Sequence, residues 1–215
     1  MLCDANQAYA DLEFVRNKNG DKKLPQFTVP AFDQFINDMR VHCAKDLPET
    51  EHWEGVRGLL RVLCADQAMR EASQSWPARR GVERVLHHDP DYGFFVGGLI
   101  RQPNHRANVH DHAHTWTIYG VLDGAERTHV YKRLDDESVP GKATLELLAQ
   151  NEAPTGTVDI VPPWVPHSEW GMGERSVAIT VRSERPGNYA QTRFDMEAGT
   201  CNMNHRGLKL IPQPV

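Results

Sequence analysis

The stretch VHDHAHTWTIYGVLDG, residues 109–124, decides the fold expected for this chain. Two histidines, His110 and His112, stand two positions apart ahead of an apolar, strand-like run. Residues two apart in a β-strand project from the same face, so both imidazoles can point to one place. Asp123-Gly124 then ends the run with a pair typical of a hairpin turn. The stretch therefore predicts a strand and hairpin that carry two candidate metal ligands, with Glu126 pairing across the hairpin.

Short β-type runs continue on both sides of this stretch. They cover residues 82–88, 92–100, 115–122, 126–134, 143–150, 157–162 and 176–183, with turn residues between them. Many short strands with regular turn signals favour an all-β barrel or sandwich over a parallel α/β sheet. The sequence therefore predicts a β-barrel over residues 80–185.

The segments before and after the barrel have a different texture. Apolar residues recur at helical spacing from Pro30, and a second helix is expected from near Glu54 to Trp76-Pro77. The tail from Pro186 has little periodicity. We expect an N-terminal helical extension over residues 1–79 and a tail over residues 186–215 that packs on the barrel.

Composition narrows the class of protein. The chain has 215 residues, of which 40% are hydrophobic and 25% charged, as in soluble globular domains. A net charge of -5 and the lack of a basic stripe argue against a nucleic-acid partner, and the Arg79-Arg80 pair is interpreted as a solvated turn. His105 is interpreted as an exposed turn residue.

Location is inferred from segments that the sequence lacks. No apolar run approaches the roughly 20 residues that cross a bilayer, so no membrane partner is expected. The first residues lack the apolar core of a signal peptide, which predicts a cytoplasmic protein. The four cysteines show no CxxC spacing, so they predict neither a structural zinc site nor a redox pair.

A third histidine completes a candidate metal site. His167 follows GTVDIVPPWVP, residues 156–166, which combines a strand with a proline-stiffened turn. Such a turn would hold the imidazole in a fixed place, and a metal that does chemistry needs open positions beside its protein ligands. His114 shares the parity of the first two histidines and is expected at the rim of the site.

These motifs resemble those of the cupin superfamily. His110, His112 and Gly124 match its first motif, and Gly156, Pro162 and His167 match its second. The resemblance implies a double-stranded β-helix, also called a jelly-roll barrel. Many cupins add a glutamate ligand at the positions held here by Trp116 and Thr117, so the implied site has three histidines and no carboxylate.

The ligand set is similar to that of the thiol dioxygenases, the cysteine and 3-mercaptopropionate dioxygenase families. The resemblance implies Fe2+ as the cofactor, with O2 and a small carboxylate-bearing thiol as substrates and a sulfinate as the product. Counting back from HDH, as in cysteine dioxygenases, points to Arg84 as the partner of the substrate carboxylate. Three neutral imidazoles leave a divalent metal with its full charge, which favours an anionic ligand such as a thiolate. The same ligands also suit zinc, nickel, copper or manganese.

One strand departs from that family. Its Ser-His-Tyr relay would fall here on Thr180, Arg182 and Glu184. Arg182 is expected either to bind a substrate anion or to pair with Glu184, and Trp116 is a candidate lining residue of the pocket. A cupin lyase or isomerase that uses a metal as a Lewis acid, and a non-catalytic ligand-binding cupin, remain alternatives. The protein is expected to be a monomer or a homodimer.

Overall fold

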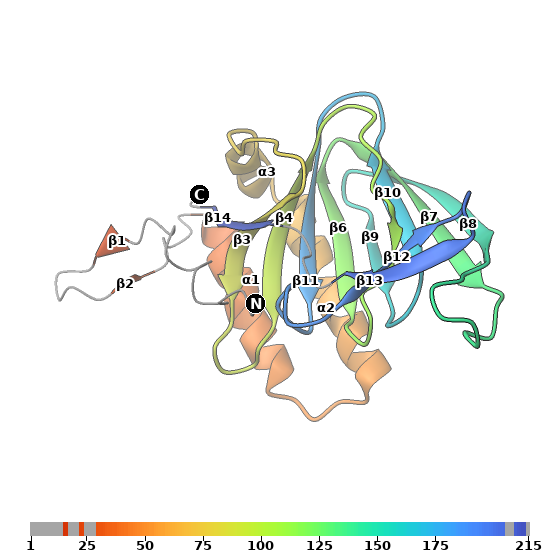
Figure 1. The fold of residues 1–215 in the computed structure, drawn as a ribbon. Helices are drawn as coiled ribbons and strands as arrows, with labels where there is room; N and C mark the ends of the chain where they lie inside the picture. The colour runs from red at the N-terminus through yellow and green to blue at the C-terminus, as the bar shows by residue number, and fades with distance from the viewer. Residues whose placement is uncertain (1–14, 17–21, 24–28, 205–208, 214–215) are drawn as a thin grey trace.

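Two six-stranded sheets face each other in the computed structural model, which describes residues 15–16, 22–23, 29–204 and 209–213 (Figure 1). The first sheet has the order β14-β3-β4-β11-β6-β9. Its strands are β3 (Val82–His88), β4 (Phe95–Arg101), β6 (Thr117–Asp123), β9 (Val158–Val161), β11 (Ser176–Arg182) and β14 (Lys209–Pro212).

The second sheet has the order β13-β12-β5-β10-β7-β8. Its strands are β5 (Val109–His110), β7 (Ala125–Arg133), β8 (Leu145–Pro154), β10 (His167–Gly171), β12 (Gln191–Asp195) and β13 (Thr200–Asn204). Almost all pairings in both sheets are antiparallel; β14 pairs with β3 in parallel. The predicted all-β jelly-roll barrel is confirmed, and each of the seven predicted runs corresponds to a strand.

Asp123-Gly124 is a corner between the sheets, so the predicted hairpin is wrong. β6 pairs with β11 and β9, whereas β7 pairs with β10 and β8. Gly124 has a φ of 77°, and a Cβ there would lie 2.7 Å from the backbone oxygen of Arg175. Asp123-Gly124 does form the predicted turn, with glycine at the positive φ, but a turn does not decide which sheet the next strand joins.

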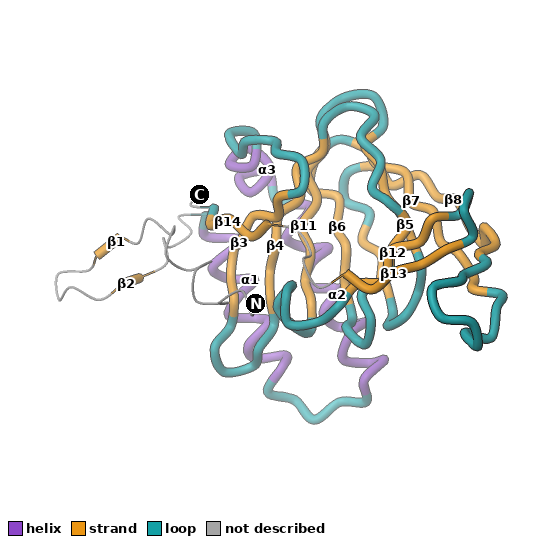
Figure 2. The backbone as a smooth tube through the Cα atoms, in the orientation of Figure 1, coloured by secondary structure: helices purple, strands orange, loops and turns teal. Residues whose placement is uncertain are grey.

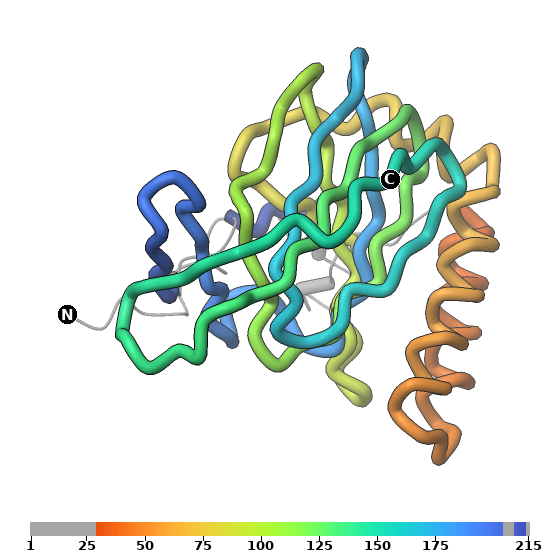
Figure 3. The backbone as a smooth tube through the Cα atoms, turned by 90° about the vertical axis from the view of Figure 1, so that its right-hand side faces the viewer, coloured from red at the N-terminus to blue at the C-terminus, as the bar shows by residue number. Residues whose placement is uncertain are grey.

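Three helices lie outside the first sheet: α1 (Pro30–Cys43), α2 (Glu49–Ala65) and α3 (Gln67–Ser73). Figures 2 and 3 show them along one side of the barrel, away from the second sheet. The second predicted helix is divided at Asp66, which is extended and whose carboxylate accepts the N–H of Met69 at 2.7 Å. This cap starts α3 as a separate helix. The predicted N-terminal helical extension is therefore present from Pro30, and most of residues 1–28 lie outside the described residues.

The helices and the first sheet share the main apolar core. Met39, Val56 and Leu60 from the helices are fully buried against Ile118 and Ile179 from the sheet. The helices contribute apolar cover, which leaves the opposite face of this sheet to line the barrel interior.

Gly120 of β6 lies in close contact with α2. A Cβ there would lie 2.7 Å from Sγ of Cys64 and 3.1 Å from Leu60. We expect Gly120→Ala to destabilise the protein by about 1–3 kcal/mol, because this interface has no room for a methyl group. The measurement is urea unfolding followed by circular dichroism.

Gly58→Ala is the control for that measurement, since a Cβ at Gly58 meets nothing within 4 Å. Gly58 lies inside α2, so this change is expected to stabilise by about 0.5–1 kcal/mol. The double variant Cys64→Ala/Gly120→Ala should be less destabilised than the sum of its single changes. Additive costs would contradict a direct clash between the two residues.

The tail supplies strands to both sheets. β12 pairs with β5 and β13 and so extends the second sheet, and β14 pairs with β3 at the edge of the first. The stretch 205–208 between them and residues 214–215 lie outside the described residues. Over the described part of the chain, no helix combines the length and apolar character required to cross a bilayer.

Candidate metal centre and its cavity

His110, His112 and His167 meet inside the barrel. Their candidate ligand atoms all lie within 4.8 Å of one another, and their ring centroids are 4.5–5.0 Å apart. β5 lies beside β10, with His110 opposite His167 in the register. His112 follows β5 in a turn and reaches the same point. The three histidines therefore come together as their sequence positions predicted.

The hydrogen bonds of the rings turn Nε2 of each histidine toward the shared point. Nδ1 of His110 donates to the Asn108 carbonyl at 2.9 Å, and Nδ1 of His167 donates to the Val165 carbonyl at 2.8 Å. Nδ1 of His112 lies 3.0 Å from Nε2 of the Gln191 side-chain amide. With that amide rotated by half a turn, its oxygen would accept an N–H from His112. A proton on Nδ1 of His110 and of His167 leaves the lone pair of each Nε2 for a metal, and His112 offers the same atom when the Gln191 oxygen faces it.

Burial disfavours the protonated form of two of the three histidines, as metal binding requires. Burial, and then the neighbouring His167, lowers the pKa of His110 to about 4. Burial, and then the two other histidines, lowers the pKa of His112 well below its ordinary value. Nε2 of His167 is buried and has no hydrogen-bond partner among the described residues. Neutral imidazoles with an unsatisfied buried nitrogen fit a divalent transition-metal ion.

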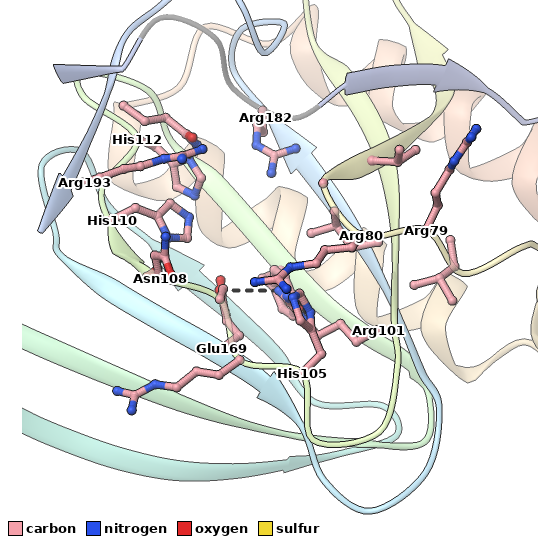
Figure 4. A pocket seen from close by; sticks show the side chains of 18 residues that line it. Arg79, Arg80, Arg101, His105, Asn108, His110, His112, Glu169, Arg182 and Arg193 are labelled. Carbon is pink, nitrogen blue, oxygen red and sulfur yellow. Dashed lines mark hydrogen bonds and ion pairs between the residues drawn. The ribbon is translucent and has the colours of Figure 1, made fainter. Parts of the chain in front are cut away.

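Glu169 is a buried carboxylate beside the three histidines. Its Oε1 lies 3.5 Å from Nε2 of His167, and its Oε2 lies 3.4 Å from Nη2 of Arg101 (Figure 4). Burial opposes the charge on Glu169, but His167 and Arg101 outweigh it, so its pKa is lowered. The resemblance implied three histidine ligands and no carboxylate ligand, and the group of candidate ligands consists of these three histidines. A carboxylate does adjoin this group, contributed by β10 and not by the strand that follows HDH.

Arg101 links Glu169 to a second buried carboxylate. Nε of Arg101 lies 3.1 Å from Oε2 of Glu126, and the same oxygen accepts a hydrogen bond from the Tyr119 hydroxyl at 2.6 Å. Oε1 of Glu126 accepts a hydrogen bond from the Ser176 hydroxyl at 2.7 Å. Burial opposes the charge on Arg101, but Tyr119 and Glu126 raise its pKa well above the ordinary value. Glu126 was expected to pair across a hairpin. Glu126 is instead fully buried, and it contacts Arg101 and Tyr119 of the first sheet across the barrel interior. The hairpin is absent because β7 belongs to the second sheet.

Arg182 is buried in the barrel and pairs with Glu83 of β3. Its Nη1 also donates to Oγ1 of Thr180 at 2.8 Å, while its Nε has no hydrogen-bond partner among the described residues. Glu184, the partner considered from the sequence, instead lies 2.9 Å from Nε2 of the exposed His114. Thr180 and Arg182 therefore face the barrel interior, and Glu184 lies outside it.

The structure does not bring Arg84 to the three histidines. Arg84 is buried and donates to the carbonyl of Pro77 at 2.6 Å, whereas its neighbour Glu83 points into the barrel toward Arg182. Successive residues of a strand point to opposite faces, so placing Glu83 inside places Arg84 outside. Counting residues back from HDH led to β3, but the inward-facing residue there is Glu83 and not Arg84.

Trp116 is likewise away from the site. Its ring stacks on Trp53 of α2 with centroids 6.0 Å apart, and it packs against the core beneath the helices. The turn between His112 and β6 breaks the alternation on which its predicted position depended. Tyr119, which lies on β6, lines the cavity instead.

A cavity of about 280 Å³ opens beside His110 and His112. Arginines dominate its polar lining, and they come from separate parts of the chain: Arg79, Arg80, Arg101, Arg182 and Arg193, which Figure 4 labels, and Arg106. His105, expected to be an exposed turn residue, is half-buried in the same lining. Arg79 and Arg80 are exposed as expected, but they stand at this cavity and not on an unrelated turn.

Two residues of the site had usable signals in the sequence. Glu169 stands two positions after His167, so strand parity alone would have placed both on one face. Arg101 directly follows the predicted run 92–100 and ends β4. Gln191 and Arg193 had no such signal, because their strand lies in a tail without periodicity.

The sequence matches no protein-family model and no curated protein. Solved structures with a similar fold include a protein of Bacillus halodurans, with 14% identity, a TM-score of 0.44, and coverage of 64% of this chain and 86% of that one. A double-stranded β-helix protein of Klebsiella pneumoniae has 15% identity, a TM-score of 0.41, and coverage of 57% and 87%. KdgF from Halomonas sp. has 15% identity, a TM-score of 0.38, and coverage of 49% and 82%. The match spans 51% of peruvianin-I, a cysteine peptidase from Thevetia peruviana, and 42% of an oxalate oxidase. These are likenesses of fold, and no activity follows from them.

Proposed function

We propose that this protein is a metal-dependent oxidoreductase of the thiol dioxygenase type within the cupin superfamily. It would use O2 to oxidise a small carboxylate-bearing thiol to the sulfinate, with both oxygen atoms entering the product. The observation that carries the proposal is the cluster of three histidines, whose candidate ligand atoms all lie within 4.8 Å of one another beside a cavity. Fe2+ is the metal that the resemblance implies, and three uncharged ligands suit a centre that must bind a thiolate.

The residues around that point have separable roles. His110, His112 and His167 would hold the metal, and Asn108, Val165 and Gln191 fix the orientation of their rings. Iron, when bound, supplies a redox centre at which a thiolate and O2 can react. Arg101 and Arg182 lie in the cavity lining and would orient the substrate carboxylate, which reduces the freedom lost on reaching the reactive geometry.

Oxygen uptake by the iron-loaded protein tests the proposal. We expect uptake with at least one small thiol acid, accompanied by stoichiometric sulfinate, and none with the corresponding hydroxy acid. An oxygen electrode and mass spectrometry of the product provide the measurement. Absence of uptake with every thiol acid tested, in protein shown to contain iron, would contradict the proposal.

Glu169 favours one alternative, a lyase or isomerase in which the metal serves as a Lewis acid. A carboxylate with a lowered pKa is ionised at neutral pH, and Glu169 lies near enough to the site to accept a proton from a substrate. This candidate predicts turnover of a carboxylate substrate without O2, and a fall of about 100-fold or more in Glu169→Gln. Glu152→Gln, a change to an exposed carboxylate of β8, is the control. Full activity in Glu169→Gln would exclude this role, and tight binding without turnover would indicate a non-catalytic protein.

A further inference from the structure

The arginines of the cavity fall into two groups. Arg101 and Arg182 are buried, and carboxylates pair with both of them. The other four are exposed or half-buried, and we call them the rim arginines: Arg79, Arg80, Arg106 and Arg193. Carboxylates thus offset the charges of Arg101 and Arg182 inside the barrel, whereas the rim arginines lie outside these ion pairs.

The rim arginines have no anionic partner in the described part of the chain. Arg79, Arg80 and Arg193 form no ion pair with any described residue. Arg106 donates to the Tyr131 hydroxyl at 3.1 Å and lies over the Trp170 ring at 4.6 Å, and both of these contacts are with neutral groups. Glu169 is the single acidic side chain among the described residues that line the cavity.

This concentration of positive charge is produced by the tertiary structure. The whole chain has a net charge of -5, so a cationic cavity does not follow from composition. Arg79 and Arg80 precede β3, Arg106 lies between β4 and β5, and Arg193 lies on β12. Three segments far apart in the sequence therefore line one cavity. Burial, followed by the nearby Arg101 and Arg80, lowers the pKa of His105 in the same wall.

We propose that the cavity binds a small dianion, with one anionic group toward the three histidines and a second on the rim arginines. The reaction that such a ligand would undergo rests on the proposed function, whereas the binding of the ligand does not. Guanidinium groups bind carboxylates and phosphates through paired hydrogen bonds, and a cleft of one sign of charge raises the local concentration of a ligand of the opposite sign. The second group is therefore a carboxylate or a phosphate.

Calorimetric titration of the full chain, with its metal content measured, tests the proposal. Succinate and butyrate form one matched pair of probes, and phosphoglycolate and glycolate form the other. We expect the member of each pair with the additional anionic group to bind at least about tenfold more tightly than its partner, which corresponds to about 1.4 kcal/mol. The pair with the larger ratio identifies the second group as carboxylate or phosphate. Equal affinities within both pairs would overturn the proposal.

Variants of the rim arginines distinguish a specific binding site from a general effect of the protein's net charge. Arg79→Gln/Arg80→Gln should remove most of the preference for the dianion, because both side chains stand at the opening and are exposed. Arg61→Gln/Lys45→Gln makes the same change in charge at exposed residues on the helical side, and it should keep the preference. Equal losses in the two double variants would overturn the proposal.

Two further measurements complete the test: the salt dependence of the dianion preference, and oxygen uptake with a pair of thiol acids. The preference should weaken between about 0.01 M and 0.15 M salt, where the Debye length falls from about 30 Å to about 8 Å; a preference insensitive to salt would count against the rim arginines. Preference for succinate without oxygen uptake from any thiol would overturn only the oxidase activity. Oxygen uptake could instead be equal with mercaptosuccinate and 3-mercaptopropionate, while succinate and butyrate bind equally. That result would overturn the proposed dianion preference and leave the proposed oxygen chemistry in place.

Discussion

His167→Ala is expected to abolish metal binding and any activity that depends on it. Nε2 of His167 is buried beside the other two histidines without a hydrogen-bond partner among the described residues, so the loss of this ring removes one of three ligands. Changes to the groups that merely orient ligating histidines typically cost about 10- to 100-fold in affinity, so loss of a ligand should cost more than about 100-fold. Metal analysis of reconstituted protein, with a competition titration for affinity, measures the effect.

His114→Ala is the matched control for that experiment. His114 belongs to the same HDHAH segment, but it is exposed and lies 2.9 Å from Glu184 outside the barrel. We expect this variant to retain its metal. Circular dichroism should show that both variants are folded. Unchanged metal content in His167→Ala would show that the proposed ligand set is wrong.

Arg101→Leu is expected to destabilise the protein by about 3–5 kcal/mol, the typical cost of removing one partner of a buried ion pair. Arg101 lies between Glu126 and Glu169, and all three side chains are buried. Its loss leaves two carboxylates in the barrel interior without a cation, and leucine cannot satisfy either. The free energy of unfolding in urea, measured without metal, provides the test.

Arg57→Leu removes an arginine from a surface pair and serves as the control. Arg57 lies 2.6 Å from Glu54 on α2, and both side chains are more than a third exposed. Exposed pairs of this kind contribute about 0–1 kcal/mol. Destabilisation by Arg101→Leu no greater than that of Arg57→Leu would contradict the structural role assigned to the buried network.

Strand periodicity carried much of the prediction, because it is a local property of the chain. Alternation and turn residues located seven strands of the barrel, and Pro30 marked the start of the helices. Parity together with a proline-stiffened turn brought His110, His112 and His167 into one candidate site. Their role as metal ligands stays a prediction.

The errors share one physical origin. Arg84 was placed at the site where Glu83 points inward, and Trp116 was placed in a cavity that Tyr119 lines. A shift of a single residue reverses the face of a strand, so counting along the chain cannot choose between neighbours. Asp123-Gly124 was read as a hairpin because a turn signal describes the bend and not the sheet that receives the next strand.

The sequence alone determined seven of the strands and the three histidines, since each depends on residues close together in the chain. Tertiary structure decided the surroundings of those histidines: Glu169 held by Arg101, Arg182 held by Glu83, and the rim arginines gathered from three segments. Closing two sheets into a barrel sets which distant strands become neighbours, and long-range packing controls that closure. The three histidines therefore mark a candidate metal centre from the sequence, while the charge of the cavity that would select its ligand is visible only in the fold.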